Sequence, residues 1–263
     1  MRRGHETRRP PTTRETHDGP VLQAEGLSRR FGGVQAVRDV GLRLHRGEVL
    51  GVIGPNGSGK TTTINLLCGA IRPGKGSVRL LGREIARKPA HAVAALGVGR
   101  TFQNPRVFST LTVLENMYVP VAHRVSPAAA RSMAARAHEW IELTGLGGFA
   151  HRVASELSGG QRKLVEFARV MVQRPAVVLM DEPFAGVHPV VKEALYAQIQ
   201  RAAGDLGTAF LVVSHEVPDL VSLSDRFVCM AQGEVLVEGA PQEVCANPSV
   251  IEAYLGAPLE GAA

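Results

Sequence analysis

The chain has few cysteines, few aromatic residues and no long hydrophobic run. Three of its 263 residues are cysteine (Cys68, Cys229 and Cys245), and their odd number and irregular spacing argue against a disulfide framework and for a reducing compartment. No uninterrupted apolar stretch approaches the roughly 20 residues that a membrane-spanning helix needs. We therefore expect a protein that does not cross a bilayer by itself.

The chain is mildly basic, with 30 Lys plus Arg against 24 Asp plus Glu and a net charge of +6. The basic side chains are scattered rather than clustered, and they are not interleaved with aromatic residues, which make up 5% of the chain. We therefore expect no nucleic-acid partner. An acidic protein surface or the anionic inner face of a membrane explains the excess equally well.

The first 20 residues differ in composition from the rest of the chain. Residues 1–20 are rich in Arg, Thr and Pro and contain no Val, Ile, Leu or Phe, which predicts a disordered basic tail. The paired arginines near the start are not followed by an apolar segment, so an export signal is not expected. We place one ordered domain at residues 21–256 and a short C-terminal tail at 257–263.

Residues 54–61 have the pattern of a phosphate-binding loop. Gly54, Gly59, Lys60 and Thr61 match G-x-x-x-x-G-K-[ST], between an apolar strand pattern at 49–53 and a helical pattern. Glycines let successive backbone N–H groups face phosphate oxygens, and the start of the helix adds partial positive charge. Lys60 supplies a charge for the β- and γ-phosphates and Thr61 a hydroxyl for Mg²⁺. The other loop positions expected to contact ATP are Pro55, Asn56, Gly57, Ser58 and Thr62.

A second candidate site follows the apolar run Val177 to Met180, which ends in Asp181 and Glu182. Buried parallel strands have such short apolar runs, and open α/β folds bind ligands at the carboxyl ends of these strands. Asp181 is therefore a candidate for holding Mg²⁺ through water. Glu182 is a candidate for polarising the water that attacks the γ-phosphate.

A second anion-binding pattern precedes the helical run at 162–173. It consists of Leu157, Ser158, Gly159, Gly160 and Gln161. Small residues at a helix start expose several N–H groups and a hydroxyl to an anion. One γ-phosphate needs only one such anion-binding site, and the phosphate loop already supplies it. We therefore expect the pattern at 157–161 to bind a nucleotide held by another subunit.

The remaining pattern is that of an α/β protein. Strand-like runs at 21–27 and 37–44 predict an antiparallel β layer, and residues 104–157 have mainly helical spacing. Strands and helices then alternate. We expect helices at 160–174 and 189–203, and strands at 176–181, 208–213 and within 226–237.

Together these motifs resemble the ATPase subunits of ATP-binding-cassette (ABC) transporters, over about residues 21–255. The resemblance implies an ABC-type P-loop ATPase core with an N-terminal antiparallel β layer and a helical subdomain at about 104–157. It implies that Phe31 stacks on adenine, that Gln103 contacts Mg²⁺ and relays to the membrane partner, and that His215 contacts the γ-phosphate. The cofactors it implies are ATP and Mg²⁺.

The family resemblance also implies partners and a location. Two cassettes, this chain twice or this chain with a paralogue, close over two ATP molecules. Residues 157–161 match the signature of the family, and each signature completes the site of the other subunit. Hydrolysis by Glu182, His215 and Lys60 reopens them, and the helical subdomain passes the motion to transmembrane permease subunits. The chain is thus expected on the cytoplasmic face of the membrane, serving indirectly an extracytoplasmic substrate-binding protein.

Two further segments resemble the larger cassette of branched-chain amino-acid importers. They are Gly97 to Asn116, with the run Arg100-Thr101-Phe102-Gln103, and the C-terminal stretch Gly239 to Gly256. A urea or amide importer, and a lipopolysaccharide-type lipid exporter, which has a stretch similar to residues 180–187, remain alternatives. A non-transport cassette is less favoured, because this chain has a single set of motifs and retains both Glu182 and His215.

Overall fold

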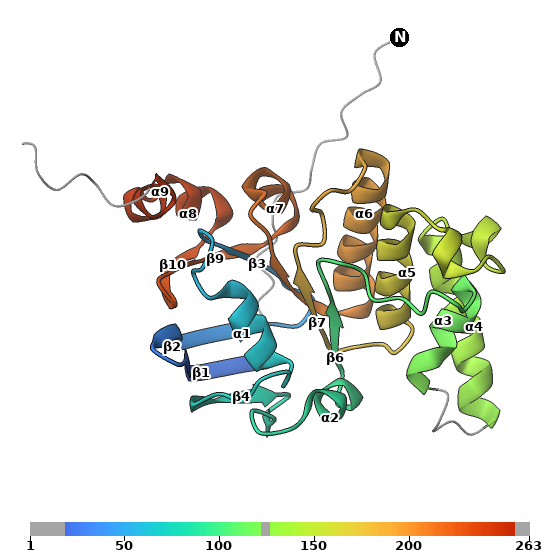
Figure 1. Cartoon of the computed structure of the whole chain (residues 1–263), viewed down its shortest axis with the longest axis horizontal. Coiled ribbons are helices and arrows are strands. Elements are labelled where there is room, and N and C mark those ends of the chain that lie inside the picture. The colour runs from blue at the N-terminus through green and yellow to red at the C-terminus, as the bar shows by residue number, and fades with distance from the viewer. Residues whose placement is uncertain (1–18, 122–126, 256–263) are drawn as a thin grey trace, which may run out of the picture.

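The computed structural model describes residues 19–121 and 127–255. The predicted tails at 1–20 and 257–263 therefore lie outside the described residues, apart from Gly19 and Pro20. Within the described part, two β-sheets and several helices form layers (Figure 1). The larger sheet lies in the middle and the smaller sheet lies toward one end, whereas α5 (Gly159–Met171) and α6 (Pro189–Leu206) stand toward the other end.

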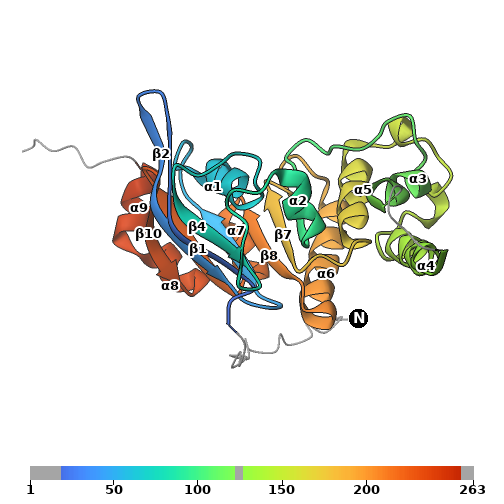
Figure 2. The same cartoon turned by 90° about the horizontal axis from the view of Figure 1, so that it is seen from below.

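The smaller sheet is the predicted antiparallel layer, with strand order β2-β1-β4-β5. Its strands are β1 (Leu22–Phe31), β2 (Val34–Leu44), β4 (Lys75–Leu80) and β5 (Arg83–Glu84). The β1–β2 hairpin is longer than predicted, because Ser28, Arg29, Arg30 and Gln35 interrupt the apolar pattern before its exposed tip at Phe31 and Val34. This outer part of the hairpin extends beyond the body of the molecule (Figure 2).

The larger sheet has the strand order β10-β9-β3-β8-β7-β6 and is parallel except for its edge strand β10. Its strands are β3 (Val49–Ile53), β6 (Val98–Thr101), β7 (Val177–Asp181), β8 (Ala209–Val213), β9 (Arg226–Ala231) and β10 (Glu234–Gly239). The central strand β3 pairs with β8 and β9, which lie far along the chain. The carboxyl ends of β3, β7 and β8 thus meet at one edge of the sheet.

The central strands are apolar throughout because both faces of this sheet are buried. Alternate residues of β8 face opposite sides. Phe210 and Val212 join a cluster with α5 and α6, whereas Leu211 and Val213 join a cluster with the antiparallel sheet and α1 (Lys60–Leu67). This period of two is the pleat of a strand. A continuous apolar run such as 177–180 is the expected sequence of such a strand.

The helices are mostly short, and the two longest described ones are α4 and α6. Their bounds are α1 (Lys60–Leu67), α2 (Ala90–Ala95), α3 (Val113–Tyr118), α4 (Pro127–Leu143), α5 (Gly159–Met171), α6 (Pro189–Leu206), α7 (Val217–Leu223), α8 (Pro241–Ala246) and α9 (Pro248–Leu255). Short 3₁₀ turns occur at Val119–Val121, Gly147–Phe149 and Ala154–Glu156. The predicted helical segment at 104–157 thus contains α3 and α4.

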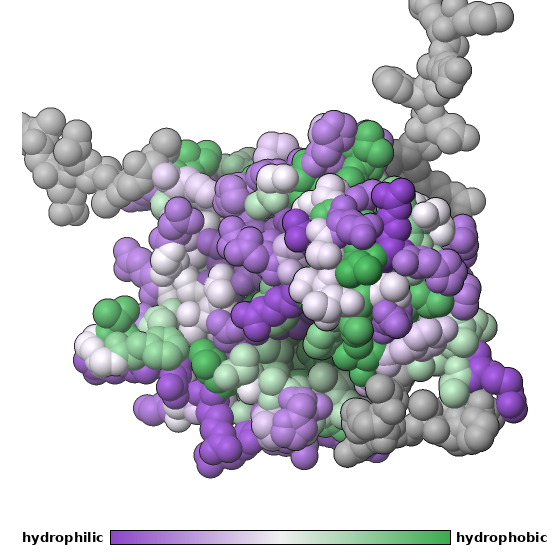
Figure 3. Space-filling view, turned by 45° about the vertical axis from the view of Figure 1, so that its right-hand side comes forward, coloured by the Kyte–Doolittle hydropathy of each residue, from purple (hydrophilic) through white to green (hydrophobic). Residues whose placement is uncertain are grey.

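In the described part of the chain, none of the helices has the length and apolar character needed to cross a membrane. On the face shown in Figure 3, hydrophobic residues gather in small groups among hydrophilic ones. Such scattered exposure is ordinary for a folded domain.

Candidate functional site

The phosphate-loop residues lie between β3 and α1, as predicted. Gly54, Gly57 and Gly59 have φ of 145°, 80° and 101°, in the region that L-residues with a side chain disfavour. A Cβ on Gly54 would lie 2.1 Å from the Met230 carbonyl oxygen, and one on Gly59 would lie 2.6 Å from the Ala36 carbonyl oxygen. The loop is therefore packed between β9 and β2, and these two positions require glycine.

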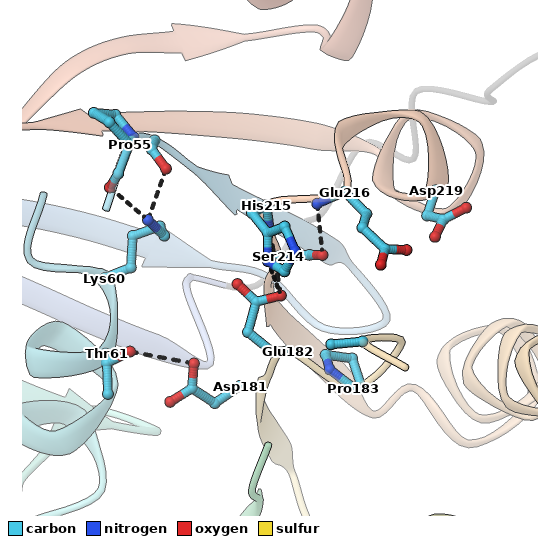
Figure 4. Close-up of polar contacts among 12 residues, drawn as sticks. Pro55, Lys60, Thr61, Asp181, Glu182, Pro183, Ser214, His215, Glu216 and Asp219 are labelled. Carbon is cyan, nitrogen blue, oxygen red and sulfur yellow. Dashed lines mark hydrogen bonds and ion pairs between the residues drawn. The ribbon is translucent and has the colours of Figure 1, made fainter. Parts of the chain in front are cut away.

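Lys60 is 8% exposed and its ammonium group points back onto the loop (Figure 4). Its Nζ donates to the carbonyl oxygens of Gly54 (2.7 Å) and Pro55 (2.8 Å), and more weakly to Ser58 Oγ at 3.4 Å. Burial lowers the pKa of Lys60, and the carboxylates of Glu182 and Asp181 partly oppose that effect. Ser58 is buried with it, whereas Asn56 and Gly57 are exposed and Pro55 and Thr62 are half-buried.

Thr61 and Asp181 come together at the ends of α1 and β7. The Thr61 hydroxyl donates to Asp181 Oδ1 at 3.3 Å. Burial raises the pKa of Asp181, and the nearby Arg100 guanidinium partly counteracts it. A hydroxyl and a carboxylate side by side are hard oxygen donors of the kind that Mg²⁺ takes beside phosphate groups, so these residues fit a magnesium site.

Glu182 and His215 form a pair at the ends of β7 and β8 (Figure 4). His215 Nδ1 lies 2.8 Å from Glu182 Oε2, and the His215 backbone N–H donates to the same oxygen at 3.3 Å. The His215 side chain is exposed, whereas that of Glu182 is 13% exposed. Glu182 also has φ of 49°, an unfavourable conformation for a non-glycine residue, and such strain concentrates at functional sites.

Two predicted residues lie at the margin of this cluster. Phe31 ends β1, is 45% exposed and has the Arg29 guanidinium 5.0 Å from its ring centroid. Its hairpin passes the phosphate loop, since Ala36 on β2 lies against Gly59. Gln103 is exposed and follows β6, the strand that pairs with β7.

The predicted signature lies away from this cluster, at the start of α5. In both ribbon views α5 is well separated from α1. Ser158 and Gln161 form a capping box: Ser158 Oγ accepts from Gln161 N at 3.2 Å, and Gln161 Oε1 accepts from Ser158 N at 2.9 Å. Leu157 is buried, Gly159 has open space around it and Gly160 packs near Val191. The capping role is thus present, and Ser158 and Gly159 also face outward.

Sequence reasoning missed two charged residues on α5 that connect the loops of the site, the buried Glu166 and the half-buried Lys163. Glu166 is 2% exposed and accepts from the backbone N–H of Phe102 (3.2 Å) and Arg106 (2.7 Å), on either side of Gln103. Lys163 Nζ donates to the carbonyl oxygens of Glu182, Pro183 and Ala185 at 3.3, 3.1 and 2.9 Å. Burial raises the pKa of Glu166 and lowers that of Lys163. Through these two side chains, helix α5 connects the loop that contains Gln103 with the loop that follows β7.

His188, which follows that loop, is exposed and begins α6 as its N-cap. Its Nδ1 accepts from Val190 N at 3.4 Å. The bond accounts for a polar residue at this helix start.

Two family models match this chain. One described as "ABC transporter" matches residues 37–185, and one described as "Branched-chain amino acid ATP-binding cassette transporter" matches residues 234–259. The first range contains the phosphate loop, the signature and the two acidic residues. The second contains β10, α8 and α9.

Curated relatives match nearly the whole chain. The branched-chain amino acid transport ATP-binding protein BraF of Pseudomonas aeruginosa is 40% identical over 90% of this chain and 98% of its own length. LivG of Escherichia coli K12, of the same description, is 36% identical over the same shares. The lipopolysaccharide export ATP-binding protein LptB of Acidithiobacillus ferridurans is 34% identical, over 90% of this chain and 97% of its own.

Solved structures match as well. A nucleotide-free ATP-binding cassette from an ABC transporter superposes with a TM-score of 0.81 at 30% identity, over 90% of this chain and 99% of the other. The ADP conformation of MJ1267, another such cassette, gives a TM-score of 0.80 at 31% identity with the same coverage.

Proposed function

Because this chain belongs to the ATP-binding-cassette family of transporter ATPases, we propose that it powers the import of branched-chain amino acids. The comparisons confirm the resemblance and the fold class expected from the motifs, and they identify an ATPase whose hydrolysis is coupled to transport. The observation that carries the choice of cargo is the C-terminal family match at 234–259, together with the higher identity to BraF than to LptB.

In this proposal, ATP binds across the edge where β3, β7 and β8 end. The loop from Gly54 to Thr62 surrounds the phosphates with backbone N–H groups, and Phe31 stacks on adenine. Lys60 exchanges its carbonyl acceptors for the β- and γ-phosphate oxygens. The burial of its ammonium group supports this role, because electrostatic interactions are stronger where water is excluded.

Thr61, Asp181 and Gln103 would hold Mg²⁺, which supplies charge neutralisation to the phosphate oxygens when it is bound. Glu182 accepts a proton from the attacking water, because its carboxylate stands at the end of β7 beside the phosphate loop. His215 holds that carboxylate through Oε2 and contacts the γ-phosphate. Phosphoryl transfer then depends mainly on positioning and charge stabilisation.

The signature, residues 157–161, acts on the nucleotide of a second cassette, which is this chain again or a paralogue. Its position away from the chain's own phosphate loop, with Ser158 and Gly159 outward, supports this assignment. We further propose that the helical subdomain at about 104–157 contacts transmembrane permease subunits at the cytoplasmic face of the membrane. An extracytoplasmic binding protein would deliver the amino acid to them.

The experiment is uptake of labelled leucine, and separately urea, in cells that carry or lack the gene. Leucine uptake should fall on deletion and return with the wild-type gene but not with Glu182→Gln. In purified protein that variant should hydrolyse ATP roughly 10²–10⁴-fold more slowly and still bind it. A loss confined to urea uptake would refute the amino-acid proposal, and so would unchanged leucine uptake accompanied by defective lipopolysaccharide export.

A further inference from the structure

The C-terminal helix touches the phosphate loop through one hydrogen bond. The backbone N–H of Gly54 donates to the phenol oxygen of Tyr254, 2.7 Å away and 200 residues later in the chain. Tyr254 lies near the end of α9 and is 40% exposed, so its ring is only partly covered. Burial nevertheless raises the pKa of its hydroxyl to about 12.

Gly54 needs such a partner because it lies just past the last residue of β3 that pairs with β9. The pairing of β3 with β9 ends at Ile53, opposite Cys229, and Gly54 is the next residue and is buried. A buried backbone N–H without an acceptor is costly. The Tyr254 hydroxyl therefore completes the hydrogen bonding of the strand at the point where the chain turns into the phosphate loop.

The carbonyl of the same residue has a different partner. Lys60 Nζ donates to Gly54 O at 2.7 Å, so the two polar backbone groups of Gly54 are bound by two different side chains. If Lys60 moves to a nucleotide phosphate, as in the proposed function, its bond to Gly54 is lost. The Tyr254 bond then remains to hold the first residue of the loop.

The C-terminal part of the chain also holds the loop at a second point. In the turn between β9 and β10, Gly233 N donates to Ser58 O at 3.1 Å, and Gly233 O accepts from Arg38 N at 2.7 Å. The beginning and the middle of the loop are thus both attached to residues beyond 230. Loss of one attachment should loosen the loop without unfolding the domain.

We propose that Tyr254 is a positioning residue that pre-organises the phosphate loop, so that α9 increases the affinity of the chain for ATP. The proposal rests on the assignment of residues 54–62 to nucleotide phosphates. A loop already held in its binding conformation loses less conformational entropy when the ligand binds. Because Tyr254 lies outside the reacting groups, it should affect nucleotide binding and leave the chemical step alone.

The test is Tyr254→Phe, which removes the hydroxyl and keeps the ring. Loss of a single hydrogen bond changes an equilibrium constant roughly 2- to 10-fold. The KM for ATP and the dissociation constant of a non-hydrolysable ATP analogue should therefore both rise by about that factor. The kcat should stay at the wild-type value. Hydrogen exchange should become faster in a peptide covering residues 53–60 and stay unchanged in α5. Tyr118→Phe, on α3, is the matched control and should change none of these.

Wild-type protein provides a second measurement that needs no variant. Because coupling between two sites is reciprocal, the non-hydrolysable analogue should slow hydrogen exchange in residues 248–255. An unchanged KM and dissociation constant in Tyr254→Phe, or unchanged exchange in α9 on nucleotide binding, would overturn the proposal. Lys60→Ala separates this outcome from a failure of the site itself: wild-type ATP turnover in that variant would refute the loop assignment.

Discussion

Gly54→Ala tests how tightly the phosphate loop is packed. The new methyl group would lie 2.1 Å from the Met230 carbonyl oxygen and 2.8 Å from Ser58 Oγ, and the residue would keep φ of 145°. Backbone strain of this kind costs about 1–3 kcal/mol, and overpacking about 1–3 kcal/mol more. We expect the free energy of unfolding to fall by about 4 kcal/mol, a large part of the about 5–15 kcal/mol of a typical domain.

Gly57→Ala separates the two causes. Gly57 lies in the same loop with φ of 80°, but a Cβ there would have open space around it. Its alanine variant should therefore show the strain alone, or about 2 kcal/mol. With roughly 2–4 °C of Tm per kcal/mol, we expect a fall in Tm of about 8–16 °C for Gly54→Ala and about 4–8 °C for Gly57→Ala.

The assay is thermal unfolding of both variants without nucleotide, followed by circular dichroism. Equal Tm values for the two variants would show that the contact with Met230 contributes nothing. A Gly54→Ala protein as stable as wild type would refute the packing argument altogether.

Two further predictions concern α5. Ser158→Arg should abolish ATP-dependent dimerisation in the Glu182→Gln background, while monomers still bind ATP. Ser155→Arg, at an exposed position outside the signature, should leave dimerisation intact. Light scattering after size exclusion would show an unchanged dimer in Ser158→Arg if the signature has no role in trans. Because burial raises the pKa of Glu166, the folded state binds that proton more tightly than the unfolded chain, so wild-type stability should fall as pH rises through the raised value. The Glu166→Gln variant should not lose stability over this pH range. Identical pH profiles of the free energy of urea unfolding for the wild type and the variant would contradict the prediction.

Much of the site could be predicted because its motifs are local in the sequence. The loop at 54–61, the acidic pair after β7 and the signature each combine a fixed spacing with a strand or helix pattern, and the structure has those elements at those places. Their roles toward ATP stay predictions.

Other features could not be predicted because they depend on contacts distant in the sequence. Glu166 bonds to Phe102, 64 residues earlier, and a glutamate on a helix is usually solvated. Strand β6 was missed because Gly99 interrupts its apolar pattern. The glycine is explained only by α5, since a Cβ there would lie 2.4 Å from Val170 Cγ1.

The short C-terminal helices did have a signal in the sequence. Pro218, Pro241 and Pro248 each occupy the first or second position of a helix, where proline is favoured. The contact of α9 with Gly54 had none, because nothing in the spacing of residues 54 and 254 indicates that they meet.

The strand order has a consequence for the synthesis of the protein. Beta-3, which leads into the phosphate loop, pairs only with β8 and β9, and these are translated after residue 208. At about 5–20 residues per second, the ribosome needs roughly 8–30 s to go from β3 to β8. During that time β3 has no strand to pair with, and an unpaired central strand is exposed to aggregation or to chaperones. A nascent chain should therefore gain its nucleotide site only after β8 and β9, at residues 209–231, have been translated.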